Sequence, residues 1–247
     1  MSAGFDAYAK GYESLHDRNV ALVGAESQEF VHDKLRWCSR FADRCFKATI
    51  ETKTFLDYGC GVGRLGFDFH RYVGKSWNYI GFDPSEESIR EAQEQYVART
   101  EKSHAAEGSV AFHTMRDWSD NRIHYDFIFA ACVFHHIEPN ERESVLRRLW
   151  GTLKPNGVLV VWEHNPWNPI TRKLVKECVF DHDACLLSIR EMGRLWRGAD
   201  ATGPDAKTGH QFVTFFPGAL HKLKPLESVL GWLPLGGQWV FWARKGA

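Results

Sequence analysis

The chain has 247 residues, 44% of them hydrophobic, and this length and apolar content favour one α/β domain with some additions over two full domains. Lys plus Arg and Asp plus Glu both number 31, so the chain lacks the basic excess that is usual in a general nucleic-acid-binding protein. No apolar run approaches the roughly 20 residues that span a bilayer, and the first residues lack the features of a signal peptide. The composition therefore predicts a cytoplasmic protein with neither a membrane span nor a nucleic-acid partner.

The first 50 residues are predicted to form an N-terminal helical cap. Apolar residues such as Phe30, Leu35 and Phe41 recur at roughly helical spacing over residues 5–47. The remainder of the chain, residues 51–247, is predicted to form the main domain.

From residue 51 onward, short apolar runs alternate with amphipathic segments. The apolar runs predict strands at 54–58, 77–82, 110–113, 125–130 and 158–162. The segments between them predict helices at 64–72, from residue 85 onward and at 141–153, with residues 154–157 (KPNG) as the turn that stops the last one. Strands separated by helices are typical of a parallel sheet.

The pattern changes after residue 164. Residues 165–205 are predicted to form a mainly helical insertion on the substrate side, ending in a loop at 201–209. Aromatic-rich runs at 211–216 and 238–243 predict two late strands. We expect one of these strands to be antiparallel and the pair to close one edge of the sheet.

A glycine-rich loop between the first strand and the following helix is the sharpest signal. Residues 61–66 (GVGRLG) fit the G-x-G-x-x-G fingerprint of dinucleotide-binding domains. Residues 59–63 (GCGVG) equally fit the G-x-G-x-G loop of S-adenosylmethionine-binding proteins. In either case Asp83, at the end of the next strand, is expected to bind the ribose hydroxyls, so the glycines leave both cofactors open.

Asp57 favours one of the two cofactors. It stands just ahead of the first glycine, where its carboxylate would repel a pyrophosphate. The same carboxylate suits a cofactor that carries an ammonium and a sulfonium group. The residue therefore favours S-adenosylmethionine over a nicotinamide dinucleotide.

In combination, the motifs of residues 50–164 resemble those of the class I S-adenosylmethionine-dependent methyltransferases. Residues 55–63 (FLDYGCGVG) resemble the first motif of that family, 79–85 (YIGFDPS) the second-strand motif, and 125–130 with 134–137 (FHHI) the fourth-strand motif. Residues 153–157 (LKPNG) resemble the turn that precedes the fifth strand, with Asn156 in place of a glycine. The resemblance implies a doubly wound α/β fold with helices on both faces of a seven-stranded mixed sheet of order 3-2-1-4-5-7-6, in which strand 7 is antiparallel.

The same resemblance implies a set of cofactor-binding residues. These are Asp57, Gly59, Cys60, Gly61, Gly63, Asp83, Pro84, Ser85, Asp117, Trp118 and Ala131. Asp117 and Trp118 fall where members of the family place an acid and an apolar neighbour around the adenine. On the N-terminal cap, Lys34 is a polar candidate for the carboxylate of the methionine moiety.

Three histidines are the candidate catalytic residues. Ligands of open α/β sheets bind beyond the carboxyl ends of the strands, which places His135 and His136 after strand 4 and His164 after strand 5 beside the cofactor. Histidine titrates near neutral pH, so it suits the removal of a proton from an acceptor hydroxyl, and we favour His135 first, His136 second and His164 third. The polar residues at 178–185 fit no standard zinc spacing, so the sequence predicts a helix cap there at Asp181 or Asp183, and no metal.

The predicted function is methyl transfer from S-adenosylmethionine to a small-molecule acceptor, with a hydroxyl of a sugar or secondary metabolite favoured. Motifs outside residues 50–164, such as 163–169 (EHNPWNP), resemble a bacterial subgroup that modifies glycans and small molecules. N- or C-methylation, an NAD(P)-dependent oxidoreductase and a non-catalytic adenosyl-ligand-binding protein stay open as alternatives. The sequence does not specify the oligomeric state.

Overall fold

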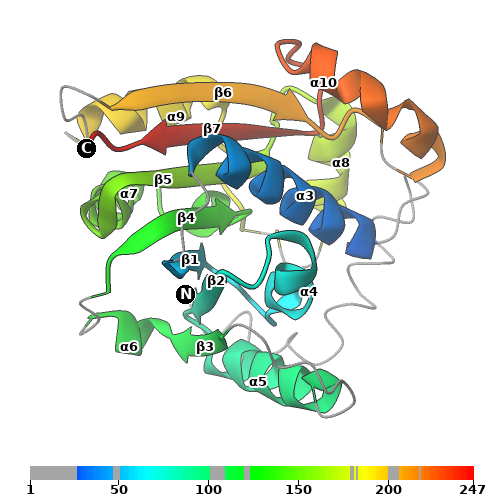
Figure 1. The fold of residues 1–247 in the computed structure, drawn as a ribbon. Helices are drawn as coiled ribbons and strands as arrows, with labels where there is room; N and C mark the ends of the chain where they lie inside the picture. Colours follow the sequence, from blue (N-terminus) through cyan, green and yellow to red (C-terminus); the bar gives the residue numbers. More distant parts are fainter. Residues whose placement is uncertain are drawn as a thin grey trace.

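A computed structural model describes residues 27–46, 51–100, 109–119, 123–178, 181, 183–199, 206–216 and 218–247. In this part of the chain seven strands form one sheet, in the order β3-β2-β1-β4-β5-β7-β6 (Figure 1). The strands are β1 (Lys53–Tyr58), β2 (Trp77–Asp83), β3 (Val110–Thr114), β4 (Tyr125–Ala131), β5 (Leu153–His164), β6 (Lys207–Val213) and β7 (Gln238–Arg244). Strands β1 to β5 are parallel, and β7 runs antiparallel to both of its neighbours, so the predicted sheet order and strand directions are confirmed.

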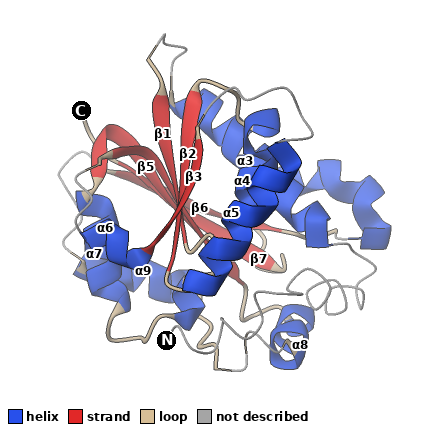
Figure 2. Ribbon diagram, turned by 90° about the horizontal axis from the view of Figure 1, so that it is seen from below, coloured by secondary structure: helices blue, strands red, loops and turns tan. Residues whose placement is uncertain are grey.

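Helices cover both faces of the sheet (Figures 1 and 2). One face carries α3, α4 and α5, the other carries α6, α7 and α9, and α8 and α10 lie at one end. Two 3-10 helices, η2 and η3, are also present. Their bounds are α3 (Ser27–Cys45), α4 (Arg64–Tyr72), α5 (Glu86–Thr100), α6 (Met115–Ser119), η2 (Phe134–His136), α7 (Arg142–Gly151), α8 (Pro169–Glu177), α9 (Ile189–Gly198), η3 (Gly218–Leu226) and α10 (Glu227–Leu230).

The core consists of two layers, because successive residues of a strand point to opposite faces of the sheet. In β1, Phe55 packs in the layer under α3 and α4, and its neighbour Leu56 packs in the layer under α7. The helices contribute matching apolar stripes, such as Leu35 and Phe41 of α3. This double coverage explains why the central strands read as nearly continuous apolar runs.

Strand β5 differs from its prediction at its start. It begins at Leu153, five residues earlier than predicted, and its register with β4 shifts between Tyr125 and Phe127. The predicted turn at 154–157 is present as an irregularity inside the strand, where Asn156 has a left-handed φ of 62°. Asparagine tolerates this conformation better than most residues, which explains why it replaces a glycine here.

Strand β6 and helix α6 differ from the sequence prediction as well. Strand β6 covers Lys207–Val213 instead of residues 211–216, because its antiparallel pairing with β7 extends back to Lys207. Helix α6 follows β3 directly, and no amphipathic pattern is resolvable over its 5 residues. Most of the predicted N-terminal cap lies outside the described residues, and its helical part within them is α3. The boundary at residue 50 and the insertion at 165–205 stay predictions.

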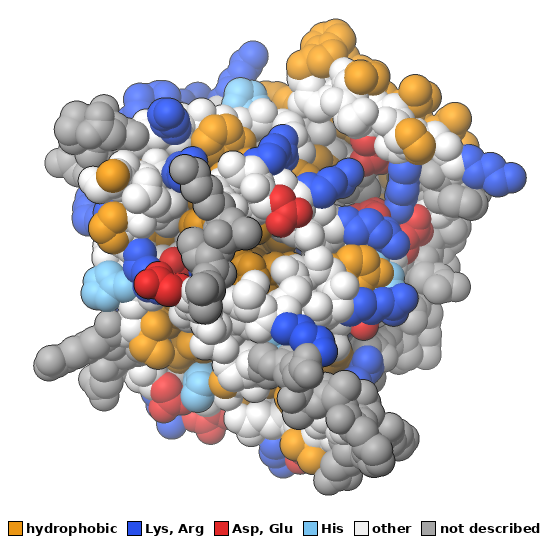
Figure 3. Space-filling view, in the orientation of Figure 1, with side chains coloured by type: hydrophobic (Ala, Val, Ile, Leu, Met, Phe, Trp, Pro, Cys, Tyr) orange, Lys and Arg blue, Asp and Glu red, His pale blue; other side chains and the backbone are white. Residues whose placement is uncertain are grey.

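Exposed apolar side chains gather over η3 and α10, at the upper right of Figure 3. They include Leu223, Leu226, Val229 and Trp232, and Trp232 is 77% exposed. Among the described residues, no helix has the length and apolar character needed to cross a membrane.

Candidate functional site: one cavity between the glycine loop and the strand ends

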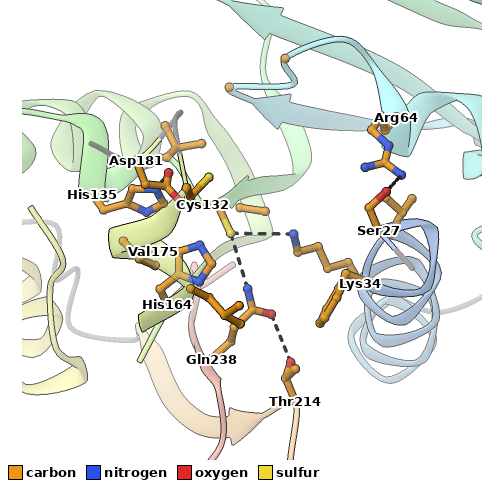
Figure 4. Close-up of a pocket in the computed structure, with 18 of the residues that line it drawn as sticks. Ser27, Lys34, Arg64, Cys132, His135, His164, Val175, Asp181, Thr214 and Gln238 are labelled. Atoms are coloured by element: carbon orange, nitrogen blue, oxygen red, sulfur yellow. Dashed lines mark hydrogen bonds and ion pairs between the residues drawn. The ribbon is translucent and has the colours of Figure 1, made fainter. Parts of the chain in front are cut away.

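A cavity of about 460 Å³ lies beyond the carboxyl ends of the parallel strands. The glycine loop after β1 and the residues after β2 line one side, and α3 lies over it. The segments after β4 and β5, together with α8 and the start of β7, line the other side (Figure 4). This is the edge of the sheet at which open α/β folds bind their ligands.

The glycine loop is held in the conformation that the motif predicts. Gly59, Gly61 and Gly63 have φ values of 77°, 53° and 77°, a region that favours glycine. Asp83 supports the loop from β2, because its carboxylate accepts hydrogen bonds from the backbone N–H of Gly61 (2.8 Å) and of Ser85 (2.9 Å). The ribose-binding acid of the prediction therefore lies directly beside the glycine loop.

Exchange of Gly63 for alanine is expected to destabilise the protein more than the same exchange at Gly61. Both positions have positive φ and carry the backbone strain of a left-handed alanine, about 1–2 kcal/mol. At Gly63 a Cβ would also lie 2.7 Å from Phe112 and 2.8 Å from Ala92, whereas at Gly61 nothing lies within 4 Å. We expect Gly63→Ala to cost at least about 1 kcal/mol more in urea denaturation; equal losses would show that α4 moves away without cost.

Asp57 is buried at the foot of the glycine loop, with 2% of its surface exposed. It accepts a hydrogen bond of 2.5 Å from the hydroxyl of Tyr79. Burial raises the pKa of Asp57 to about 7, although the Tyr79 hydrogen bond and the charge of Lys34 lower it. The carboxyl group would ionise more readily beside a bound cation, which matches the role predicted from the sequence.

Helix α3 brings the cationic side chain of Lys34 over the cavity. Lys34 points toward the end of β4, and its Nζ lies 3.8 Å from the Sγ of Cys132 (Figure 4). Nearer the glycine loop, Arg64 donates a hydrogen bond of 2.8 Å to the hydroxyl of Ser27, which ties α3 to the start of α4. Lys34 therefore lines the cavity, and its role toward a cofactor carboxylate stays a prediction.

Cys132, the first residue after β4, has a polar environment. Its backbone φ of 59° lies in the left-handed region. Its Sγ accepts a hydrogen bond from the Nε2 of Gln238 at 3.6 Å, in addition to the contact with Lys34. The amide of Gln238 is oriented by the indole N–H of Trp162, which donates to its oxygen at 2.9 Å. Burial raises the pKa of Cys132, but Lys34 and His164 outweigh burial and lower the pKa to about 7.

Glu163 of β5 holds the segment after β4 in place through hydrogen bonds. It is fully buried, and its Oε1 accepts the backbone N–H groups of Val133 (2.9 Å) and Phe134 (2.6 Å). Its Oε2 lies 2.5 Å from the Nδ1 of His135. Burial raises the pKa of Glu163, but the charge and the hydrogen bond of His135 outweigh it, and the pKa is lowered.

The three predicted histidines meet on this wall of the cavity, with ring centroids 4.1 Å apart for His135 and His136 and 5.2 Å apart for His135 and His164. Asp181 joins them, because its Oδ1 lies 3.4 Å from Nε2 of His135 and 3.3 Å from Nε2 of His136. Its side chain faces the histidines and caps no helix, since Ser188 caps α9. The helix cap predicted at Asp181 or Asp183 is therefore wrong, because Cys178 is the C-cap residue of α8 and Ser188 is the N-cap residue of α9.

Residues 56–159 match a family model described as a methyltransferase domain. The match begins in β1 and ends within β5, so it covers the glycine loop, Asp83 and the segment after β4.

Residues 56–159 therefore form a methyltransferase domain, and the sheet has the class I S-adenosylmethionine-dependent methyltransferase fold.

Solved structures show that the fold of this methyltransferase is shared along nearly its whole length. The plantazolicin methyltransferase BpumL, solved with S-adenosylhomocysteine (SAH), has a TM-score of 0.65 at 16% identity and covers 98% of this chain and 95% of its own. Magnesium protoporphyrin IX methyltransferase from Synechocystis PCC 6803, also with SAH, has a TM-score of 0.57 at 13% identity, covering 97% and 99%. An O-methyltransferase family 2 protein from Planctomyces limnophilus in complex with apigenin has a TM-score of 0.57 at 18% identity, covering 89% and 62%.

Most of the predicted site residues of the methyltransferase line the cavity. They are Asp57, Gly59, Cys60, Gly61, Asp83, Pro84, Ala131, His135, His136 and His164. Gly63, Ser85, Asp117 and Trp118 are not among its lining residues. Gly63 is the residue before α4, and the hydroxyl of Ser85 accepts the N–H of Ser88 at the start of α5. Asp117 accepts the N–H of Thr114, and Trp118 is buried against Tyr58.

Glu163, Gln238 and Cys132 have no role in the sequence-based prediction of the methyltransferase site. Glu163 and Cys132 did stand at the predicted strand ends, but their positions alone do not reveal which groups they contact. Gln238 lies at the start of the antiparallel strand β7, and only its pairing opposite His164 brings it to the cavity.

Proposed function

We propose that this methyltransferase transfers the methyl group of S-adenosylmethionine to a hydroxyl oxygen of a small molecule, a sugar or a secondary metabolite. One observation carries the proposal: Asp83, the predicted ribose-binding acid, lines the same cavity as Cys132 and His164. A cavity of about 460 Å³ has the size of a small-molecule site. The magnesium protoporphyrin IX methyltransferase and the apigenin-bound O-methyltransferase support a small-molecule acceptor, since their folds are alike.

The residues along the cavity suggest how the cofactor lies. Asp83 would bind the ribose hydroxyls, and the glycine loop would lie against the adenosyl group. Asp57 and Lys34 would face the charged ends of the methionine moiety, the ammonium and the carboxylate respectively. This orientation directs the sulfonium methyl toward the segment after β4, which carries Cys132 and the histidines.

The Cys132–His164 pair is the proton acceptor in this proposal. Although burial disfavours a charged ring, Glu163 and Asp181 hold the pKa of His135 well above its ordinary value, so His135 is a poor base. When Cys132 is ionised, the pair holds one proton, on His164. The thiolate of Cys132 accepts a second proton, from the acceptor hydroxyl, as the hydroxyl oxygen attacks the methyl carbon. Displacement of SAH needs no further chemical group, so alignment and exclusion of water supply the rest of the rate.

The rate of methyl transfer is expected to rise with pH up to about 7, the pKa of Cys132. At saturating S-adenosylmethionine, kcat/KM for the acceptor should fall about tenfold for each pH unit below that value, because the proton acceptor becomes protonated. Cys132→Ser should lower kcat/KM above pH 7 at least about tenfold and should remove the fall of kcat/KM below pH 7. Since Asp57 also titrates near 7, Asp57→Asn serves as the control; loss of this fall only in Asp57→Asn would contradict the assignment.

The proposed function is tested with S-adenosylmethionine carrying an isotope-labelled methyl group and a panel of phenols, sugars and amines. We expect label on an oxygen of the product, located by NMR, and SAH as the second product. Label on nitrogen or carbon would overturn the O-directed assignment while leaving methyl transfer intact. Transfer to none of the small molecules, with transfer to a protein or RNA, would overturn the acceptor class.

A further inference from the structure

Two histidines and one carboxylate form a compact cluster on the cavity wall. His135 and His136 lie in η2, and Asp181 lies in the segment after α8. Their Nε2 and Oδ1 ligand atoms all lie within 4.8 Å of one another, and all three residues line the cavity. The proton transfer proposed above uses none of them.

The distances within the cluster match a metal site better than a hydrogen-bonded one. The Oδ1 of Asp181 lies 3.4 Å from Nε2 of His135 and 3.3 Å from Nε2 of His136, beyond the 2.7–2.9 Å of a charge-assisted hydrogen bond. Zinc holds nitrogen and oxygen ligands at about 2.0–2.1 Å in a tetrahedron, which sets neighbouring ligand atoms about 3.3 Å apart. Two of the three pairs of ligand atoms therefore already have the spacing of a zinc site, and the two histidine nitrogens lie within 4.8 Å of each other.

A buried nitrogen atom points to a ligand independently of these distances. The side chain of His135 is 1% exposed, and its Nε2 makes no hydrogen bond. Its Nδ1 lies 2.5 Å from the carboxylate of Glu163, so the Nδ1–H stays in place and a metal ion would take the position of the proton on Nε2. A carboxylate that orients a histidine in this way is the usual outer partner of a metal-binding imidazole.

The backbone holds the three residues in place. The carbonyl of His135 accepts a hydrogen bond of 2.8 Å from the N–H of Cys185, which joins η2 to the segment of Asp181. Asp181 itself donates its N–H to the carbonyl of Cys178 at 3.2 Å and accepts that of Ala184 at 3.0 Å. Backbone hydrogen bonds between η2 and the Asp181 segment and within that segment therefore hold the cluster together.

We propose that His135, His136 and Asp181 bind a divalent transition-metal ion of the Zn²⁺ type, with its remaining coordination position open to the cavity. Three protein ligands and one open position are typical of catalytic zinc sites. An acceptor hydroxyl that coordinates there would be oriented toward the methyl group and would become more acidic. This role rests on the proposed function, whereas the binding of the ion does not. Binding of a metal ion at these residues would contradict the prediction from the sequence that the protein binds no metal.

The test measures metal binding by the full chain, without any acceptor. Chelator-treated protein is titrated with Zn²⁺ in competition with a chromogenic chelator and, separately, with Co²⁺ followed by visible absorption. We expect one equivalent to bind and Co²⁺ to show the intense d–d bands of a four- or five-coordinate site. Asp181→Asn should weaken binding at least about a hundredfold, since it removes the only charged ligand. His136→Ala, a second variant in case Asp181→Asn fails to fold, should have a similar effect.

Matched controls exclude other metal-binding groups. Asp183→Asn makes the same change on an exposed carboxylate of the same segment, and His210→Ala removes an exposed histidine of β6; neither should change the affinity. Equal affinity in wild-type protein, Asp181→Asn and His136→Ala would assign the ion to another site, such as the exposed Cys185, and overturn the proposal. Absence of binding would overturn it too, while methyl transfer by that metal-free protein would leave the proposed function standing.

Discussion

Replacement of Glu163 with alanine is expected to lower the free energy of unfolding by at least about 3 kcal/mol. The carboxylate is fully buried and accepts three donors, the N–H groups of Val133 and Phe134 and the Nδ1 of His135. Alanine leaves all three donors without an acceptor, away from water, and leaves a cavity behind. Urea denaturation followed by far-UV circular dichroism measures the change.

Two further variants show whether burial of the hydrogen-bonded charge is the cause. Glu143→Ala removes a half-exposed carboxylate paired with Arg147 at 2.8 Å, and it should cost no more than about 1 kcal/mol. Glu163→Gln keeps an oxygen for the backbone donors but loses the charge opposite His135, so we expect a loss between the other two. A loss at Glu163→Ala no larger than at Glu143→Ala would contradict this account of the segment after β4.

The stability difference between wild-type protein and Glu163→Gln should also depend on pH. His135 lowers the pKa of Glu163 in the folded protein, although burial opposes it, so the unfolded chain takes up the proton first on acidification. The carboxylate therefore contributes stability above the unfolded value of about 4.3 and loses it as the pH falls further. The difference should accordingly shrink in acid.

Replacement of Asp83 with alanine is expected to weaken the binding of SAH at least about tenfold. The variant loses the predicted charge-assisted hydrogen bonds to the ribose. It also loses the acceptor that holds the N–H of Gly61 at 2.8 Å, so the glycine loop is less well formed before the ligand binds. Isothermal titration calorimetry measures the affinity directly and needs no acceptor.

Asp83→Asn and Asp117→Ala serve as matched variants for this titration. Asparagine keeps one oxygen for the N–H of Gly61, so a loss shared by both Asp83 variants reflects the charge at the ribose. Asp117 lies outside the cavity and accepts the N–H of Thr114, so Asp117→Ala should leave the affinity within about threefold. Unchanged affinity in Asp83→Ala would remove this residue from the cofactor site.

Parts of the fold that depend on local pattern could be predicted from the sequence. The helix and strand alternation from residue 51 onward follows from apolar periodicity, and the loop at Gly59–Gly63 follows from the conformational freedom of glycine. At two places the pairing between strands gives strand limits that differ from those predicted from the local pattern. The irregularity at 154–157 lies inside β5 because the strand pairs with β4 on both sides of it, and β6 starts at Lys207 because β7 is long enough to pair with it.

The sequence by itself therefore determined the sheet with its glycine loop, the position of Asp83 after the second strand and the three histidines at the strand ends. Only the tertiary structure decided the surroundings of those histidines. Glu163 reaches His135 from β5, Asp181 reaches it from beyond α8, and Gln238 reaches Cys132 from β7. The physical reason is that hydrogen bonds and ion pairs act over a few ångströms. Side chains 28 to 106 positions apart meet only after the sheet has set the register of their strands.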